Sequence, residues 1–337
     1  MTELLHTKDL HIGYTASKGK AYEVAGPVDL HFKPGEIVAL VGPNGSGKST
    51  LLKTITGLLK PIAGEIFLGN ESITQLSLRE RARRMALVTT HFGGAHAMTG
   101  FDSVALGRSP HSGWLDRLTE HDREVVQHSM ESTDSTHLAT RFVDELSDGE
   151  RQRLAIARAL AQEASLILLD EPTAFLDLPH RVGLLGLLRN LCRSKQVGVI
   201  LSTHDLDLAM RFADRMLVLD GKGHVEYDLP EALALQGVFS RVFSTQDVFF
   251  DMKHGSFHFA QLGCIQVAFK GQGLVADWTR RALRRKGWII DDVQYPLIEV
   301  CEDPVTPSWQ ISANANDQKE VYNLEALLDW LSKIRLT

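Results

Sequence analysis

The sequence contains little cysteine and no long apolar segment, and each scarcity excludes a class of protein. Only three cysteines occur, Cys192, Cys264 and Cys301, far apart and without a C-x-x-C pair, so we expect neither a disulfide framework nor a zinc site. No apolar run approaches the roughly 20 residues of a membrane-spanning helix, and the N-terminal residues do not resemble a signal peptide. We therefore expect a protein of the reducing cytosol that is not secreted and does not itself cross a membrane.

An excess of positive charge is also missing. The formal net charge of -6 argues against general nucleic-acid binding through bulk electrostatics. The fourteen histidines lack the tight spacing and the carboxylate or thiol company of metal ligands, so we expect surface positions for most of them. With 337 residues, of which 44% are hydrophobic and 23% charged, the chain is typical of a globular protein of two domains.

Three short apolar runs predict buried parallel strands, and each is followed by polar residues. The runs are Ile37–Val41, Leu166–Leu169 and Val197–Leu201, and they lead into GPNGSGKST, DEP and STHD. Open α/β sheets bind ligands at the carboxyl ends of their strands. We therefore expect a ligand site where these three polar segments meet.

The texture of the sequence divides the chain into two domains. The first covers residues 1–252 and includes a charged, Arg-rich segment, at about residues 75–150, that predicts a helical insertion. A turn within residues 251–256 marks the boundary. Residues 253–337 alternate strand-like and helix-like segments, which predicts a small α+β domain of undetermined role. Its last helix is expected to place four apolar residues on one face, Val321, Leu324, Leu328 and Leu331.

A basic segment of the second domain, WTRRALRRKG, has two interpretations. Its arginines could form a regulatory anion or nucleic-acid surface, or they could be the solvated face of an ordinary helix. The pattern contains no catalytic constellation.

The strongest motif is a phosphate-binding loop between a predicted strand and a predicted helix. It matches G-x-x-x-x-G-K-[ST], in which backbone N–H groups wrap phosphates, the lysine reaches the β and γ phosphates, and the following hydroxyl binds Mg²⁺. Lys48 and Ser49 take the last two roles. The nucleotide-binding residues of the loop are Gly42, Pro43, Asn44, Gly45, Ser46, Gly47, Lys48, Ser49 and Thr50.

Two acids supply the second half of a nucleotide site. In LILLDEP, Asp170 ends an apolar strand and is placed to hold Mg²⁺, and Glu171 follows where it could activate a water. Acids often end strands, so the motif gains its meaning from the phosphate loop.

The stretch ELSDGERQR predicts the start of a helix. Ser147 and Asp148 are residues that favour an N-cap, Gly149 permits close approach to the backbone, and an apolar period follows from Leu154. The N–H groups and dipole of such a helix start attract an anion.

In this order, the phosphate loop, LSDGE, LLDEP and STHD resemble the ATP-binding-cassette (ABC) ATPases over roughly residues 5–250. The resemblance implies a P-loop NTPase with a RecA-like α/β core, an antiparallel β subdomain and a helical subdomain, here followed by the small α+β domain. It also implies ATP and Mg²⁺ as ligands and a head-to-tail dimer, in which the LSGGQ-type signature of one copy meets the γ-phosphate held by the other. The signature positions of this chain are Ser147, Asp148, Gly149 and Glu150.

Other family roles follow from matching positions. Tyr14 matches the aromatic that stacks on adenine, although Tyr22 is a rival. Asp177 matches the D-loop aspartate. His204 matches the switch histidine that contacts the γ-phosphate, so the resemblance implies Glu171, His204 and Lys48 as catalytic residues.

This chain departs from the family pattern in two places. Thr90 stands where a glutamine usually reaches Mg²⁺ and the attacking water, and its hydroxyl lacks that reach. Asp148 and Glu150 replace the second glycine and the glutamine of LSGGQ. We expect the added negative charge to tune turnover.

The segment GRSPH, residues 107–111, resembles the GRxPH of cassettes that serve importers of iron-siderophore complexes, haem and cobalamin. The alternative is an exposed turn at Pro110 and Gly113. The resemblance implies a peripheral ATPase at the cytoplasmic face of the inner membrane. Its partners would be a second copy, a polytopic permease of FecCD type and a separate substrate-binding protein, without nucleic acid. The alternatives are a soluble ABC ATPase outside transport and a regulatory ATP switch.

Overall fold

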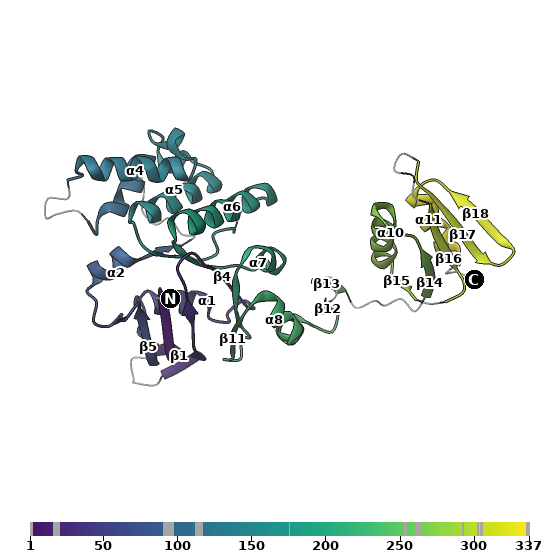
Figure 1. Cartoon of the computed structure of the whole chain (residues 1–337), viewed down its shortest axis with the longest axis horizontal. Coiled ribbons are helices and arrows are strands. Elements are labelled where there is room, and N and C mark those ends of the chain that lie inside the picture. Colours follow the sequence, from purple (N-terminus) through teal and green to yellow (C-terminus); the bar gives the residue numbers. More distant parts are fainter. Residues whose placement is uncertain are drawn as a thin grey trace. The chain divides into compact units, whose positions relative to one another are not determined.

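The computed structural model describes residues 3–15, 21–89, 98–111, 117–174, 176–252, 255–259, 265–291, 293–301, 303 and 306–334. The chain forms two compact units, one of Met1–Thr245 with Phe250–Phe257 and one of Gln246–Phe249 with His258–Thr337. The division falls in the hairpin of β12 (Val248–Asp251) and β13 (Ser256–Phe259) (Figure 1). In the described part of the chain, no helix is long and apolar enough to span a membrane.

A six-stranded sheet forms the centre of the first unit, in the order β11-β10-β4-β9-β8-β7. All neighbouring pairs are parallel except β10–β11. The three apolar runs predicted as strands are confirmed, the third shifted by one residue. The strands are β4 (Ile37–Val41), β7 (Met85–Val88), β8 (Leu166–Leu169), β9 (Gly198–Ser202), β10 (Arg215–Leu219) and β11 (Val225–Asp228).

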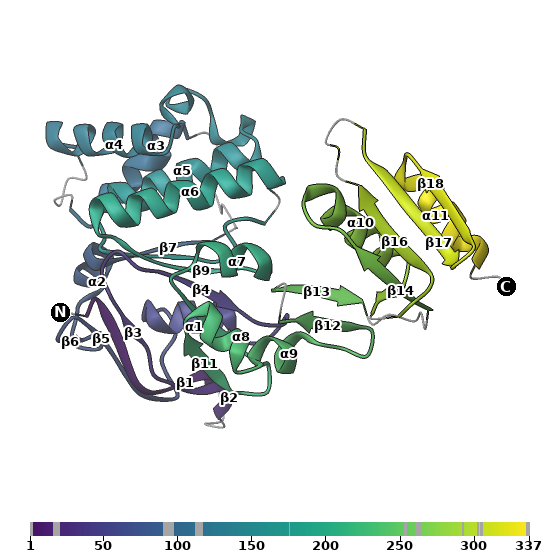
Figure 2. The ribbon, with the colours of Figure 1, turned by 45° about the vertical axis from the view of Figure 1, so that its right-hand side comes forward.

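Both faces of this sheet are covered, which explains why its central strands are apolar throughout. Along β4, Ala39 and Val41 face one hydrophobic core, formed with α5 (Asp148–Ala161), α6 (Leu178–Lys195) and α7 (Leu206–Phe212). Val38 and Leu40 face a second core, formed with α1 (Lys48–Ile55). Figure 2 shows the sheet between α5 and α6 on one side and α1 on the other. The short helices α8 (Pro230–Leu235) and α9 (Val238–Phe243) add to the first core.

An antiparallel sheet packs on the second core. Its order is β2-β1-β5-β6, and β3 also pairs with β1. Leu10 and Ile12 of β1 are fully buried in the core that contains Leu51 and Leu52 of α1. The strands are β1 (Leu5–Thr15), β2 (Ala21–Val28), β3 (His31–Phe32), β5 (Ala63–Leu68) and β6 (Glu71–Ser72).

The helical part of the unit starts its helices with local side-chain hydrogen bonds. A Ser or Thr and an acid three residues later form a capping box at the start of each of four helices, which satisfies N–H groups that have no partner within the helix. These helices are α2 (Leu78–Arg84), α3 (Gly100–Ala105), α4 (Glu120–Ser132) and α5; η1 (Leu106–Arg108), η2 (Thr136–Leu138) and η3 (Val143–Glu145) are short 3-10 helices.

The range of about 75–150, predicted as a helical insertion, is not helical throughout. It contains β7, which pairs with β8 in the central sheet. The four residues MALV of β7 are too few to stand out as an apolar run beside the arginines of α2, and only the pairing with β8 reveals the strand. The packed helical core instead joins α3, α4 and α5 through Val104, Val126, Met130 and Leu154.

The segment GRSPH connects this helical core to the end of α5. Arg108 is only 3% exposed; its Nε donates to Asp122 Oδ1 (2.8 Å), and its Nη1 donates to Glu163 Oε2 (2.6 Å) and to the carbonyl of Ala161 (2.8 Å). His111 Nε2 lies 2.9 Å from the carbonyl of Gln162. Pro110 lies in a turn, but Gly113 lies outside the described residues. The buried arginine thus ties η1 to α4 and to the carboxyl end of α5.

The second unit is a five-stranded sheet with two helices, in agreement with the expected α+β fold. The strand order is β15-β14-β16-β17-β18. Its core contains Val267, Ile298 and Trp309 from the sheet and Leu283 and Leu327 from the helices. The elements are β14 (Ile265–Lys270), α10 (Leu274–Arg285), β15 (Trp288–Ile290), β16 (Leu297–Cys301), β17 (Ser308–Asn314), β18 (Asp317–Val321) and α11 (Leu324–Ile334).

The apolar face predicted for the last helix was partly wrong. Val321 ends β18 and pairs with Trp309, because the turn at residues 315–316 returns the chain to the sheet. Leu327 and Leu331 are the fully buried residues of α11, whereas Leu324 and Leu328 are half-buried. The prediction joined a strand residue to a helix period.

Replacing Arg108 by glutamine should loosen the helical core, because the buried Asp122 carboxylate loses its cation. Breaking one partner of a buried ion pair costs about 3 kcal/mol or more. We expect faster amide hydrogen exchange throughout α4 and α5. Arg123→Gln is the matched control, because Arg123 follows Asp122 on α4 and is exposed. Equal protection of the amides from exchange in the two variants would contradict the buried role of Arg108.

Candidate functional site

The phosphate loop joins β4 to α1 in a conformation that needs glycine. Gly47 has φ +103° at the start of α1, and a Cβ there would lie 2.4 Å from Val24 Cγ1. A Cβ on Gly42 would lie 2.4 Å from the carbonyl oxygen of Leu219. The loop therefore keeps its N–H groups close to the sheet edge, which is the geometry of a phosphate nest.

Two side chains of this loop, Lys48 and Ser46, are buried and have polar atoms that a phosphate could contact. Lys48 is 6% exposed, and its Nζ donates to the carbonyls of Gly42 (2.9 Å) and Pro43 (3.1 Å). Burial lowers the pKa of Lys48, and the charges of Glu171 and Asp170 act against this shift. Ser46 Oγ is buried with no hydrogen-bond partner among the described residues. Phosphate oxygens would satisfy both groups.

The acids predicted after β8 lie beside the end of β9. Ser202, the last residue of β9, donates its hydroxyl to Asp170 Oδ1 (2.8 Å) and accepts the N–H of Glu171 (2.8 Å). The register that pairs Leu169 with Leu201 brings these groups together. Ser202 is fully buried. We did not predict its role, although a serine at the end of an apolar strand was the available signal.

Glu171 stands in a strained backbone conformation and contacts His204. Its φ of +52° lies in the left-handed region, which costs a residue with a Cβ about 1 kcal/mol or more. Its Oε1 forms a hydrogen bond with His204 Nε2. The structure thus brings together Lys48, Asp170, Glu171 and His204, and a carboxylate next to an imidazole can orient a water and accept its proton.

The residues expected to hold Mg²⁺ fit an ion whose remaining coordination positions are filled by phosphate oxygens and waters. Asp170 is positioned by Ser202, and Ser49 is half-buried in the first turn of α1. No group of three or more His, Cys, Asp or Glu side chains suited to a metal occurs in the described ranges. Mg²⁺ commonly takes only one or two protein ligands beside substrate phosphates and waters, so one hydroxyl and one carboxylate suffice.

The two tyrosine candidates for adenine stacking are direct neighbours. Tyr14 of β1 pairs with Tyr22 of β2. The hydroxyl of Tyr14 lies 2.9 Å from Thr50 Oγ1 in the phosphate loop, whereas Tyr22 is 70% exposed. The contact with Thr50 favours Tyr14 as the ring that meets adenine.

The signature residues begin α5, and the predicted N-cap at Ser147 is confirmed. One of the N–H groups at this helix start already has a partner, because Ser147 Oγ accepts the N–H of Glu150 (3.4 Å). In return, Glu150 Oε2 accepts the N–H (2.8 Å) and the hydroxyl (2.9 Å) of Ser147. Asp148 pairs with Arg151 (3.3 Å), and Gly149 is half-buried.

Asp177 is the N-cap of α6, where its carboxylate accepts the N–H of His180 (3.2 Å). Hydrogen bonds from the His180 side chain and then from its backbone lower the pKa of Asp177. Thr90, the remaining position expected from the sequence, lies outside the described residues.

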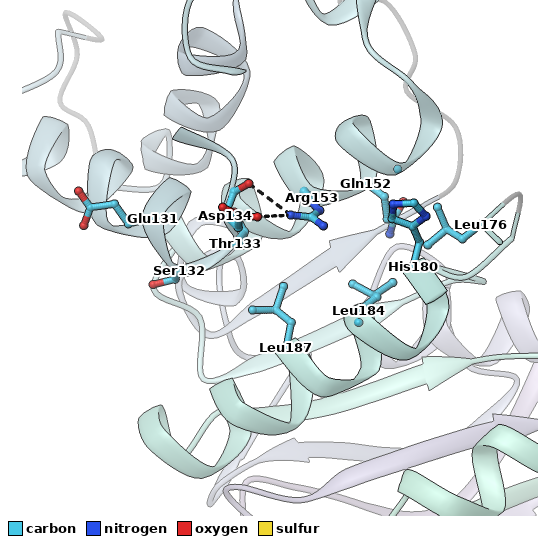
Figure 3. Close-up of a pocket in the computed structure, with 12 residues that line it drawn as sticks. Glu131, Ser132, Thr133, Asp134, Gln152, Arg153, Leu176, His180, Leu184 and Leu187 are labelled. Carbon is cyan, nitrogen blue, oxygen red and sulfur yellow. Dashed lines mark hydrogen bonds and ion pairs between the residues drawn. The ribbon is translucent and has the colours of Figure 1, made fainter. Parts of the chain in front are cut away.

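A cavity of about 220 Å³ lies between α4, α5 and α6 rather than at the phosphate loop (Figure 3). Its wall includes Gly149 of the signature, Gln152, and Leu176 and His180 near the start of α6. Gln152 Nε2 is buried without a partner among the described residues. The polar side chains that converge at the ends of β4, β8 and β9 remain the better candidate for chemistry.

The fold and the site together define a P-loop ATPase. Residues 25–174 match the family described as ABC transporter, and residues 264–332 match the iron ABC transporter C-terminal domain. The hemin import ATP-binding protein HmuV of Nocardia farcinica is 39% identical over 241 residues, covering 71% of this chain and 82% of its own length.

Two further similarities agree with this match. The ferric enterobactin transport ATP-binding protein FepC of Escherichia coli is 37% identical over 247 residues, covering 73% of this chain and 89% of its own length. A dimeric ATP-binding cassette in a post-hydrolysis state, bound to ADP and Pi, superposes with a TM-score of 0.59 at 28% identity, covering 67% of this chain and 98% of the other. The chain belongs to the ABC transporter family and is an ATPase, so the resemblance seen in the sequence is confirmed.

Replacing Tyr14 by alanine should weaken ATP binding about tenfold, because a base stacked on an aromatic ring contributes about 1–3 kcal/mol. Tyr22→Ala, across the strand pair, is the matched control and should have little effect. Titration calorimetry with ATP measures both. A larger loss with Tyr22→Ala would transfer the adenine contact to that ring.

Proposed function

We propose that this chain is the ATP-hydrolysing subunit of an importer for an iron-siderophore complex, haem or cobalamin. The observation that carries the proposal is the match of residues 264–332 to the iron ABC transporter C-terminal domain, together with relatives named for ferric enterobactin and hemin. In this proposal, residues 1–252 bind nucleotide and residues 253–337 form a separate domain.

The proposed chemistry assigns one role to each group at the sheet edge. Lys48 and the loop N–H groups hold the phosphates, while Ser49 and Asp170 hold Mg²⁺, which neutralises the phosphate charge. Glu171 orients the attacking water and accepts its proton. His204, hydrogen-bonded to Glu171, is placed to keep that carboxylate aimed and to contact the γ-phosphate. Thr90 is assigned the position where the family has its glutamine.

A second copy completes the proposed site. Ser147 and Gly149 begin α5, with Ser147 exposed, and we assign them to the γ-phosphate bound by a partner in a head-to-tail dimer. Asp177 caps α6 and is assigned the D-loop contact. The similar cassette that was solved as a dimer bound to ADP and Pi supports a dimer.

The proposed assembly includes a polytopic permease of the FecCD type and a separate substrate-binding protein. Relatives named as a transport ATP-binding protein and an import ATP-binding protein support it. The proposed location is the cytoplasmic face of the inner membrane. A slow regulatory switch is the second candidate, because Glu150 caps Ser147 with a negative charge.

Glu171→Gln should trap an ATP-bound dimer, because an amide cannot accept the proton of the attacking water. Lys48→Ala should lose nucleotide binding instead. Light scattering with saturating ATP and Mg²⁺ distinguishes the two, with Glu124→Gln, an exposed acid on α4, as the control. A Glu171→Gln protein that stays monomeric would refute the shared site.

Purification of the chain from its native membranes in mild detergent should recover a polytopic permease in stoichiometric amount. Mass spectrometry of the co-purified chains identifies the class of permease. Recovery of the chain alone, or with nucleic acid, would overturn the transport proposal. A permease that fails to stimulate ATPase turnover would favour the regulatory switch.

A further inference from the structure

The start of α5 is unusually acidic for a surface assigned to meet a phosphate. Residues 141–153 contain four acids and three arginines, namely Asp144, Glu145, Asp148 and Glu150 with Arg141, Arg151 and Arg153. The segment therefore has a net negative charge. ATP with Mg²⁺ is also negative, so this surface needs local compensation to receive it.

Glu150 occupies the donors of the signature serine. Its Oε2 accepts both the N–H (2.8 Å) and the hydroxyl (2.9 Å) of Ser147. A serine hydroxyl has a single proton to donate, so a γ-phosphate oxygen that binds Ser147 Oγ must replace the carboxylate there. Two anions that share one donor repel each other, whereas the glutamine of the family pattern would bring no charge.

Arg141 holds the other oxygen of the same carboxylate. Its Nη1 donates to Glu150 Oε1 (2.9 Å), and its Nη2 donates to the carbonyl of Glu145 (3.0 Å). The second contact fixes the guanidinium on η3, the short helix that precedes α5. The neighbouring cations have other partners, because Arg151 pairs with Asp148 and Arg153 pairs with Asp134.

The charge state of Glu150 makes this pairing relevant at neutral pH. Hydrogen bonds from the Ser147 backbone and hydroxyl, followed by the Arg141 cation, lower the pKa of the Glu150 carboxyl. Glu150 is therefore ionised in the range where ATP binds, and protonation cannot relieve the repulsion.

We propose that Arg141 is a positioning residue of the shared ATP site, which neutralises Glu150 and draws it from Ser147 when the γ-phosphate of a second copy arrives. The inference rests on the proposed function, since that phosphate comes from a partner. It explains how an acidic signature remains able to close on ATP: the carboxylate keeps one oxygen on Arg141 while Ser147 changes partner.

The test measures ATP-driven dimerisation in a Glu171→Gln background, in which hydrolysis does not remove the dimer. Light scattering is recorded as MgATP is titrated into the full chain carrying Arg141→Gln, Glu150→Gln, or both changes. We expect Arg141→Gln to raise the half-maximal ATP concentration about tenfold, because it leaves Glu150 uncompensated. Glu150→Gln should lower that concentration.

The double variant separates charge compensation from a merely structural role. With Glu150 neutral, Arg141 has no charge to compensate, so Arg141→Gln with Glu150→Gln should behave like Glu150→Gln alone. A double variant as impaired as Arg141→Gln would overturn the inference, as would normal dimerisation by Arg141→Gln. Arg153→Gln removes an arginine of α5 that pairs with Asp134 instead of Glu150; it is the matched control and should behave like the parent.

A second readout shows which proposal has failed. Binding of a fluorescent ATP analogue by the monomer reports the phosphate loop of the same copy, and no variant of Arg141 or Glu150 should change it. A Glu171→Gln parent that binds nucleotide but stays monomeric overturns the shared site and this inference together. If the parent dimerises but Glu150→Gln does not restore dimerisation to the Arg141→Gln variant, only the inference is overturned.

Discussion

The parallel pairing of β4, β9 and β8 is the constraint on which the nucleotide site depends. Leu40 pairs with Ser202, and Leu201 pairs with Leu169, so the three strands end together. The loops that follow these strands therefore lie at the same edge of the sheet. Because alternate residues of β4 face two different cores, a shift by one residue would place every side chain on the wrong face. The two cores therefore fix the strand register, and the register places the loops of the site at one edge of the sheet.

Buried polar groups refine what the strands place. Ser202 connects Asp170 to the backbone of Glu171, so the two acids cannot move independently. Arg108 performs a similar task at the carboxyl end of α5, where it joins Asp122 of α4 to the carbonyl of Ala161. The same helix therefore has a buried ion pair near its carboxyl end and the signature serine at its start.

The signature segment of this chain differs from the family pattern in its charge, because Glu150 stands in place of a glutamine. The capping box that starts α5 would form equally well with glutamine, since the amide oxygen accepts the same N–H. The carboxylate of Glu150 adds a negative charge and a second acceptor oxygen, and this oxygen accepts a hydrogen bond from Arg141 Nη1. In our proposal, Glu150 and the arriving phosphate compete for the hydroxyl of Ser147, and Arg141 neutralises Glu150 when the phosphate takes its place.

The sequence by itself determined the parts that depend on local chemistry. The phosphate loop, the strand-ending acids, the capped signature helix and the ABC family could all be predicted, because glycines, apolar runs and N-cap residues act over a few residues. Only the tertiary structure decided which side chains pair outside such local patterns: Ser202 with Asp170, Arg108 with Asp122 and Glu163, and Arg141 with Glu150. It also assigned β7 to the central sheet and Val321 to β18. These outcomes arise from strand register and from the pairing of buried charges, which no short stretch of sequence encodes.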